Sequence, residues 1–265
     1  MSKLFFFDID GTLIDCTKGL YHIPETTKNA LNELKRTNND VFLATGRSKC
    51  FILDSVMEYP FNGYVTCNGA YVEYKGETVY KKVISPEAII TTIKLCKERN
   101  LLFYFEGNDY IYVLDKNNKK HIQFRDEWGM KEKTIIDEFD PYQIETYIGM
   151  IVVNSKEDLQ PVINTLSPYF NVQKHQKGLS FDLTGKDESK AKGIQKLIEH
   201  LGKDIQDTVA FGDGRNDIEM LSHVGLGIAM GNGAIETREV ADYITDDVDK
   251  DGIMKALQHF QFINR

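Results

Sequence analysis

The sequence lacks the patterns that mark zinc-stabilised and disulfide-bonded proteins. It has four cysteines in 265 residues, and no two of them form a CxxC pair. Its six histidines show neither HxxxH nor HExxH spacing. We therefore expect no structural zinc site and no disulfide framework, and the isolated thiols suit a reducing compartment.

Long apolar runs and an excess of positive charge are missing as well. No stretch approaches the ~20 apolar residues that a membrane-spanning helix needs. The first apolar run, Leu4–Phe7, meets Asp8 too soon to be the core of a signal peptide. We therefore expect a cytoplasmic protein with no membrane partner. The 32 basic residues against 40 acidic ones also argue against a nucleic-acid partner. Oligomeric state cannot be read from the sequence.

The composition is that of a globular protein, with 42% hydrophobic and 27% charged residues. Buried-strand patterns at 4–7, 41–44 and 64–67 alternate with helical patterns, including one expected over 47–59, and the same alternation returns after residue 190. Residues 86–183 instead mix hairpins with helices, and 115–133 give no clear pattern. We predict an α/β fold: a Rossmann-like core with a parallel sheet and helices on both faces (1–83 and 185–265), and an inserted α+β cap domain (84–184).

The strongest chemical signal is Asp8-Ile9-Asp10-Gly11-Thr12, at the end of the first predicted strand. Ligands of open α/β sheets bind beyond the carboxyl ends of the strands. Two carboxylates this close repel one another unless a cation compensates, which indicates a hard divalent ion such as Mg²⁺. Read alone, the segment is also compatible with a simple turn in which Asp and Gly serve the backbone.

Two further segments offer groups that suit a phosphate. Thr45-Gly46-Arg47 follows the second strand and supplies a hydroxyl, an accessible N–H and a guanidinium, although an ordinary strand–turn–helix junction has the same composition. Lys190 begins a helix whose apolar face continues through Ile194 and Leu197. It is therefore either an end residue that reaches out to solvent or a cation directed inward.

The last segment is Gly212-Asp213-Gly214-Arg215-Asn216-Asp217, after the buried pattern at 208–211. Asp213 and Asp217 are four residues apart at a helix start and can face one cavity, or can form a capped, acidic first turn. The fold should bring all four segments to one edge of the sheet. Together they supply what metal-assisted attack on a phosphate needs: a nucleophile, an acid, a cation and hydrogen-bond donors.

The order of these four motifs resembles the haloacid dehalogenase (HAD) superfamily of phosphohydrolases over the whole chain. The interval between the first two motifs is too short for a cap domain, and the large insert lies between the second and third. This arrangement is similar to that of the Cof-like branch. Asn68-Gly69-Ala70 and the ending Ala241-Asp242-Tyr243-Ile244-Thr245 also resemble that branch.

The resemblance implies a role for each motif. Asp8 would be the nucleophile that forms an aspartyl-phosphate, and Asp10 would protonate the leaving group and then activate water. Mg²⁺ would be held by Asp8, the backbone carbonyl of Asp10 and Asp213, with Asp217 acting directly or through water. Phosphate or substrate would be bound by Thr45, Gly46, Arg47, Asn68, Lys190 and Asn216, of which Thr45 and Lys190 also count as catalytic.

We therefore expect a Mg²⁺-dependent phosphatase that acts on a small phosphorylated metabolite. A sugar phosphate is the leading substrate class, with pyridoxal phosphate and flavin mononucleotide as alternatives. One competing hypothesis is a phosphohexomutase, which shares this core and cap type. Another is a phospho-accepting signalling protein such as a response-regulator receiver, although receivers are about half this length and have no cap.

One glycine pattern imitates a nucleotide-binding fingerprint. Gly225, Gly227 and Gly231 have a spacing close to that of a dinucleotide-binding loop. However, they run through the strand expected at 226–230 instead of following it. We predict no nucleotide role for them.

Overall fold

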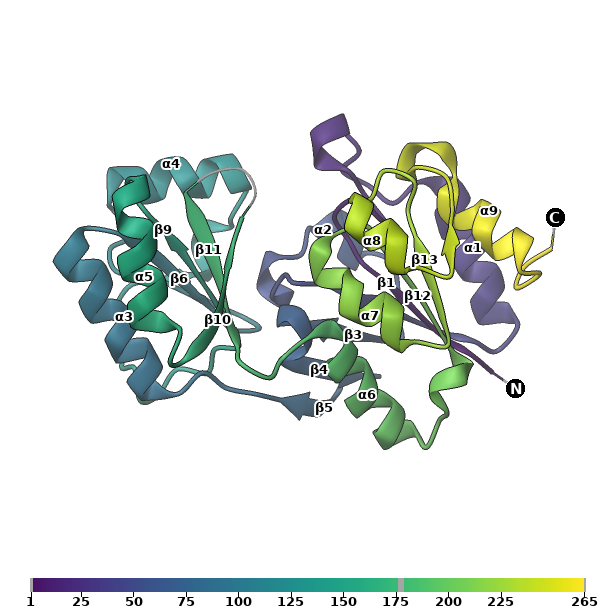
Figure 1. Cartoon of the computed structure of the whole chain (residues 1–265), viewed down its shortest axis with the longest axis horizontal. Helices are drawn as coiled ribbons and strands as arrows, with labels where there is room; N and C mark the ends of the chain where they lie inside the picture. Colours follow the sequence, from purple (N-terminus) through teal and green to yellow (C-terminus); the bar gives the residue numbers. More distant parts are fainter. Residues whose placement is uncertain (1, 176–178, 265) are drawn as a thin grey trace. The chain divides into compact units, whose positions relative to one another are not determined.

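The computed structural model describes residues 2–175 and 179–264, and the chain divides into two compact units (Figure 1). The first unit is formed by the residues up to Gly46, Ile52–Tyr80 and the residues from Ser189 onward. The second is formed by Arg47–Phe51 and Lys81–Glu188. The short segment that directly follows Thr45-Gly46 therefore groups with the second unit.

The first unit contains an eight-stranded sheet in the order β14-β13-β12-β1-β2-β3-β4-β5. Its six parallel strands are β1 (Leu4–Phe7), β2 (Asp40–Ala44), β3 (Gly63–Thr66), β12 (Thr208–Gly212), β13 (Leu226–Ala229) and β14 (Tyr243–Ile244). At one end, β4 (Tyr71–Tyr74) pairs antiparallel with β3 and is followed by β5 (Glu77–Lys81). The carboxyl ends of β1, β2, β3 and β12 consequently lie at the same edge.

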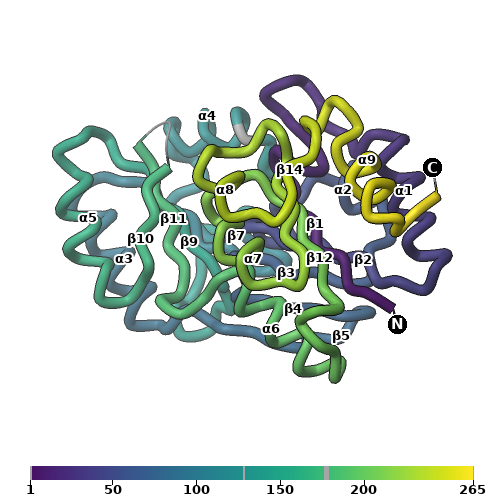
Figure 2. Tube along the Cα trace, turned by 45° about the vertical axis from the view of Figure 1, so that its right-hand side comes forward, coloured from purple at the N-terminus to yellow at the C-terminus, as the bar shows by residue number. Residues whose placement is uncertain are grey.

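Helices cover both faces of this sheet because its central strands carry buried apolar side chains on both faces. Side chains alternate along β1, so Phe5 and Phe7 pack on one face while Leu4 and Phe6 pack on the other. The first face is covered by α1 (Glu25–Arg36) and α9 (Gly252–His259), which come from opposite ends of the chain and lie side by side (Figure 2). The second face is covered by α6 (Lys190–Leu201) and α7 (Ile218–His223).

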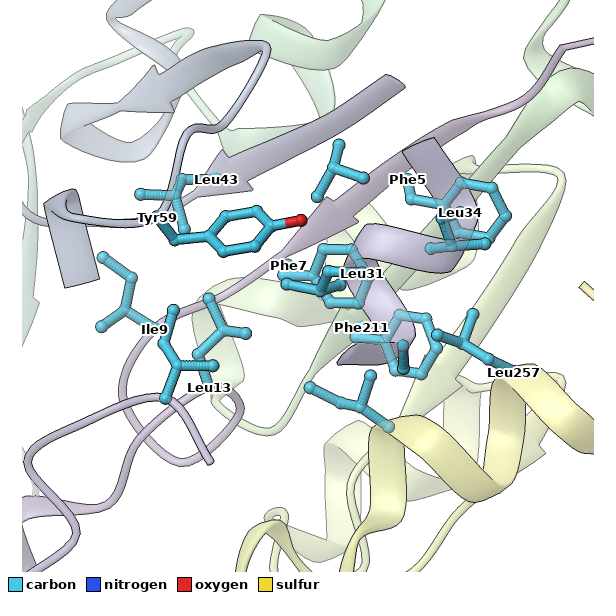
Figure 3. Packing of buried hydrophobic residues seen from close by; sticks show 14 of the residues in the cluster. Phe5, Phe7, Ile9, Leu13, Leu31, Leu34, Leu43, Tyr59, Phe211 and Leu257 are labelled. Carbon is cyan, nitrogen blue, oxygen red and sulfur yellow. The ribbon is translucent and has the colours of Figure 1, made fainter. Parts of the chain in front are cut away.

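Aromatic and aliphatic side chains fill the core beneath α1 and α9 (Figure 3). Phe7 of β1 stacks on Phe211 of β12 with ring centroids 4.8 Å apart. Leu31 and Leu34 of α1 are fully buried against them. Because Asp8 follows Phe7 directly, this packing fixes the position from which its carboxylate leaves the sheet.

The second unit contains a six-stranded sheet in the order β10-β11-β9-β6-β7-β8. The strands are β6 (Leu102–Glu106), β7 (Ile111–Tyr112), β8 (Ile135–Ile136), β9 (Ile148–Val152), β10 (Phe170–Lys174) and β11 (Ser180–Gly185). One face packs on α3 (Pro86–Arg99) and α5 (Leu159–Leu166) through Phe103, Phe105 and Ile151. The opposite face carries Tyr104, which contacts His121 and Phe124 of α4 (Lys119–Trp128).

The predicted α/β class with an α+β insert is confirmed, but the helix expected over 47–59 is wrong. The structure has a 3₁₀ turn at Lys49–Phe51 and a short α2 (Asp54–Met57), separated by an extended Leu53 with φ −62° and ψ 140°. The helix cannot continue because Cys50 and Phe51 pack into an apolar cluster of the second unit. The structure also resolves the uncertain stretch at 115–133, where Asn118 caps the N-terminus of α4.

Within residues 2–175 and 179–264, no helix combines the length and the apolar character needed to cross a bilayer.

Candidate active site

Asp8 is a buried carboxylate at the carboxyl edge of the first unit's sheet. Its residue is 6% exposed, and its Oδ1 accepts a hydrogen bond of 2.7 Å from Lys190 Nζ. Burial raises the pKa of Asp8, Lys190 opposes the shift, and the charges of Asp217 and Asp10 add to it, so that the pKa lies at about 7. The side chain is thus held in a setting where its charge needs compensation.

Lys190 supplies one compensating charge from the first turn of α6. Ser189 caps this helix by accepting from the N–H of Lys192, which fixes where the helix begins. Lys190 Nζ lies 2.7 Å from Asp8 Oδ1 and 2.6 Å from Asp217 Oδ1, and the side chain is fully buried. Burial works against its charge, yet the two carboxylates hold the pKa of Lys190 above its usual range. Of the two orientations left open by the sequence, the inward-directed cation is confirmed.

The loop after β12 carries the other two acids of the site. Asp217 is fully buried, and its Oδ2 accepts the N–H groups of Asp213 at 3.0 Å and Gly214 at 2.9 Å, which closes the loop. Asp213 Oδ1 accepts a hydrogen bond of 3.0 Å from the Thr12 hydroxyl. Burial and, to a smaller extent, the charges of Asp8 and Asp217 together raise the pKa of Asp213 to about 8.

These acids fit a divalent cation. Asp8, Asp213 and Asp217 each offer a carboxylate oxygen, and these atoms lie within 4.8 Å of one another. An all-oxygen set of acids is the donor chemistry of a hard ion such as Mg²⁺. A bound cation would offset the burial and the mutual repulsion that raise the pKa values of Asp8 and Asp213. The Asp10 side chain is exposed and is not one of the three. The resemblance assigns the backbone carbonyl of Asp10 to the metal.

The residues expected to bind phosphate come from three adjacent loops. Thr45 follows β2 and is buried, and its carbonyl accepts the N–H of Asn68 from the loop after β3. Asn216, after β12, donates from Nδ2 to Asn68 Oδ1 at 3.2 Å. A Cβ on Gly46 would lie only 3.1 Å from Asn68 Oδ1 and 3.4 Å from Asn216 Nδ2. The fold therefore brings all four residues together at one place.

Arg47 differs from these four because it groups with the second unit. Its Nη1 donates to the carbonyl of Phe51 at 3.0 Å, and the guanidinium lies over the Phe51 ring, 5.1 Å from the centroid. Both of these contacts are with Phe51, which lies four residues further along the chain. Its expected contact with substrate stays a prediction.

Two further residues lie around the acids, and their roles were not predicted from the sequence. Thr12 is fully buried and bonds to Asp213, and its presence inside the first motif was the available signal. Asn232 donates from Nδ2 to the carbonyl of Gly11 at 2.8 Å. Its position between Gly231 and Gly233 marks a tight loop but does not indicate a partner.

A comparison of the sequence with models of known protein families identifies the family of this chain. The model that describes haloacid dehalogenase-like hydrolases matches residues 5–257. The chain belongs to the haloacid dehalogenase-like hydrolases. Among curated proteins, it is 33% identical to "Putative phosphatase YkrA" of Bacillus subtilis (strain 168) over 97% of both chains.

Solved structures place the chain in one branch of the HAD family. A protein from Geobacillus kaustophilus HTA426 superposes with a TM-score of 0.89 at 31% identity, covering 99% of this chain and 100% of that one. The HAD subclass IIB sugar phosphatase BT4131 superposes with a TM-score of 0.84, also at 31% identity and the same coverage. This HAD chain is therefore a subclass IIB, Cof-like member and an enzyme of the phosphatase type, and not a signalling receiver.

Proposed function

We propose that this protein is a Mg²⁺-dependent phosphatase that hydrolyses a small phosphorylated metabolite through an aspartyl-phosphate on Asp8. The observation that carries the proposal is the buried cluster at the sheet edge. There, Lys190 bridges Asp8 and Asp217, while the carboxylate of Asp213 lies within 4.8 Å. A nucleophile, a fixed cation and spare acidic ligands in one place suit phosphoryl transfer.

Two carboxylates divide the chemistry in this proposal. Asp8 Oδ attacks the phosphorus, the bond from phosphorus to the leaving oxygen breaks, and Asp10 gives that oxygen its proton. Asp10 then takes a proton from the water that attacks the aspartyl-phosphate, which releases inorganic phosphate and restores Asp8. The different environments of a buried Asp8 and an exposed Asp10 support distinct roles for the two.

The remaining residues would bind and hold the substrate. Lys190 neutralises the charge of the attacking carboxylate and of the phosphoryl group. Thr45, Gly46, Asn68 and Asn216 bind phosphoryl oxygens, which their convergence supports. Arg47 is proposed to contact the substrate on the strength of the family resemblance alone.

The metal ligands in this proposal are Asp8, the backbone carbonyl of Asp10, and Asp213, with Asp217 acting directly or through water. When bound, Mg²⁺ supplies positive charge that lets two anions meet and stabilises the charge on the transferring group. The raised pKa values of Asp8 and Asp213 support this set, because burial and the neighbouring carboxylates disfavour their negative charge and a bound cation would offset that cost.

A sugar phosphate is the proposed substrate class. The supporting observation is the similarity, at 31% identity over 99% of this chain, to the subclass IIB sugar phosphatase BT4131. Pyridoxal phosphate and flavin mononucleotide are the alternatives to be compared with it. A cytoplasmic location stays a prediction from the isolated cysteines.

The proposal is tested by measuring phosphate release, first from p-nitrophenyl phosphate and then from a panel of sugar phosphates, pyridoxal phosphate and flavin mononucleotide. We expect release that requires Mg²⁺, stops with excess chelator and returns when Mg²⁺ is restored. Isomerisation of a hexose phosphate without net release would instead support a mutase. Activity that persists in Asp8→Asn would contradict the mechanism.

A further inference from the structure

The loop that follows β13 contacts both acidic loops of the proposed metal site, although it belongs to none of the four motifs. It contains Gly231, Asn232 and Gly233, and the first of these glycines is part of the pattern that imitates a nucleotide fingerprint. Gly231 N–H donates to the carbonyl of Asp246, and Gly233 N–H donates to that of Met230. These bonds hold the loop in a tight turn that presents the Asn232 side chain.

The carboxamide of Asn232 forms hydrogen bonds with one backbone carbonyl and one backbone N–H. Its Nδ2 donates to the carbonyl of Gly11 at 2.8 Å, and its Oδ1 accepts the N–H of Val248 at 2.9 Å. A carbonyl can only accept and an N–H can only donate, so these partners fix the orientation of the amide. A carboxylate of the same shape could keep the bond to Val248 but could not donate to Gly11.

The Gly11 carbonyl belongs to the peptide that supports Asp213. Gly11 has φ +87°, and a Cβ at this position would lie 2.1 Å from Asp213 Oδ2, so the backbone passes directly beside the carboxylate. The next residue, Thr12, donates from its hydroxyl to Asp213 Oδ1 at 3.0 Å. The peptide plane that Asn232 holds therefore sets the position of Thr12 relative to Asp213.

The same loop also holds the backbone of Asp213. The N–H of Ala234 donates to the carbonyl of Asp213 at 2.9 Å. A Cβ on Gly233 would lie 2.9 Å from the carbonyl oxygen of Met230 and 3.1 Å from Asp213 Cα, so a larger residue would force the backbone to shift. One loop thus contacts the turn that follows Asp8 and Asp10 on one side and Asp213 on the other.

We infer that Asn232 is a positioning residue for the metal site. It fixes the spacing between the Asp10–Thr12 turn and Asp213, and so acts on metal affinity through residues that it bonds. This inference rests on the proposed Mg²⁺ site. Removing a residue that orients metal ligands in this way typically weakens metal binding by about 10–100-fold.

The decisive variant is Asn232→Asp, because its added charge and its loss of ligand positioning would change Mg²⁺ affinity in opposite directions. An added carboxylate near the cluster would attract a cation and tighten Mg²⁺ binding if charge alone mattered. Loss of the bond to Gly11 instead predicts an increase of about 10-fold or more in the Mg²⁺ dissociation constant. The constant is measured by isothermal titration calorimetry without substrate, and Asn232→Ala provides a second, uncharged variant.

The matched control is Asn164→Asp, the same change at an exposed position on α5 in the second unit. It should bind Mg²⁺ like the parent. Catalysis adds a second readout: in Asn232→Asp, saturating Mg²⁺ should restore most of kcat with the KM for substrate little changed. Circular dichroism and unfolding temperature without Mg²⁺ show whether each variant is folded.

The outcomes separate the inference from the proposed function. A Mg²⁺ dissociation constant within about twofold of the parent in folded Asn232→Asp and Asn232→Ala, with only a lower unfolding temperature, overturns the positioning role. A parent that binds Mg²⁺ but hydrolyses no phosphate ester leaves the inference standing and overturns the proposed function. A parent that binds no Mg²⁺ overturns both.

Discussion

Each of the two units buries a carboxylate whose pKa is raised to about 7, but the surroundings of the two groups differ. Asp8 of the first unit is bonded to a buried lysine and has two further carboxylates within 4.8 Å. Glu106 of the second unit is 6% exposed and accepts a hydrogen bond of 2.6 Å from the buried Ser48 hydroxyl. Burial is the largest cause of the shift in both.

The difference shows that a buried acid with a raised pKa does not by itself mark an active site. A lone carboxylate such as Glu106 can relieve the cost of burial by taking up a proton. Where several carboxylates surround one lysine, their negative charge exceeds the positive charge of that lysine. A divalent cation can balance the remaining negative charge. The grouping of acids therefore carries the functional argument, and the predictions below test that distinction.

The largest expected effect is on catalysis. Asp8→Asn removes the proposed nucleophile while keeping the shape of the side chain, and we expect kcat to fall on the order of 10⁴-fold or more. Glu106→Gln removes a buried carboxylate of similar pKa and should retain activity. Phosphate-release assays of both variants measure the contrast, and equal losses in the two would break it.

Lys190→Met should have the largest effect on stability. It leaves Asp8 and Asp217 buried without their cation, and we expect the free energy of unfolding to fall by about 3–5 kcal/mol. Urea unfolding in the presence of a chelator measures this loss. Lys196→Met on the same helix removes a partly exposed lysine and should cost no more than about 0.5 kcal/mol. Similar losses in the two variants would show that Lys190 does not compensate the acids.

Glu106→Gln should change how stability depends on pH. The pKa of Glu106 is raised from 4.5 to about 7 in the folded protein, so the folded state binds this proton more tightly than the unfolded chain. The stabilisation is present below about pH 4.5 and is lost as the pH rises towards 7, a change of up to about 3 kcal/mol.

The measurement is urea unfolding of parent and variant across that pH range. The free energy of unfolding of the parent should fall relative to Glu106→Gln as the pH rises, and the two curves should run parallel above about pH 8. Glu127→Gln removes an exposed carboxylate in the same unit and should follow the parent. Parallel curves for parent and Glu106→Gln at every pH would contradict the assignment.

Ser48→Ala should have the smallest effect. It removes the hydroxyl that donates to Glu106 and should cost about 1–2 kcal/mol, because the buried acceptor loses its partner. The loss should be larger at pH 8 than at pH 6, since the charged carboxylate depends more on this donor. Ser222→Ala, at an exposed helix position, serves as the control. A loss of stability that is the same at both pH values would show that the contribution of Ser48 does not depend on the protonation state of Glu106.

Sequence patterns predicted those features of the structure that depend only on neighbouring residues. Apolar strands followed by Asp8, Thr45 and Asp213 place these residues at one sheet edge, because parallel strands end on the same side. Helical phase placed Lys190 at the start of the buried face of its helix, but it left open whether the side chain reaches solvent or points inward. Each of these inferences needed only the neighbouring residues and the geometry of a regular element.

The parts that the sequence did not predict are pairs of single residues from distant segments. Ser48 and Glu106 lie 58 positions apart, and Gly11 and Asn232 lie 221 positions apart. No periodic pattern relates such residues, and their hydrogen bonds exist only once the units have folded. The helix wrongly expected over 47–59 fails for the same reason, since Cys50 and Phe51 follow a tertiary contact instead of their local spacing.

The central claim, a covalent phosphoryl transfer to Asp8, is tested most directly by trapping the intermediate. Asp10→Asn should accept a phosphoryl group from p-nitrophenyl phosphate, whose leaving phenolate needs no proton from an acid. It should hydrolyse the aspartyl-phosphate slowly, because it lacks the proposed base that activates water. Acid quenching followed by peptide mass spectrometry should then find one phosphoryl group on the peptide that contains Asp8, and none in the double variant that also carries Asp8→Asn. Turnover without a phosphorylated Asp8, or a phosphoryl group on another residue, would contradict the account.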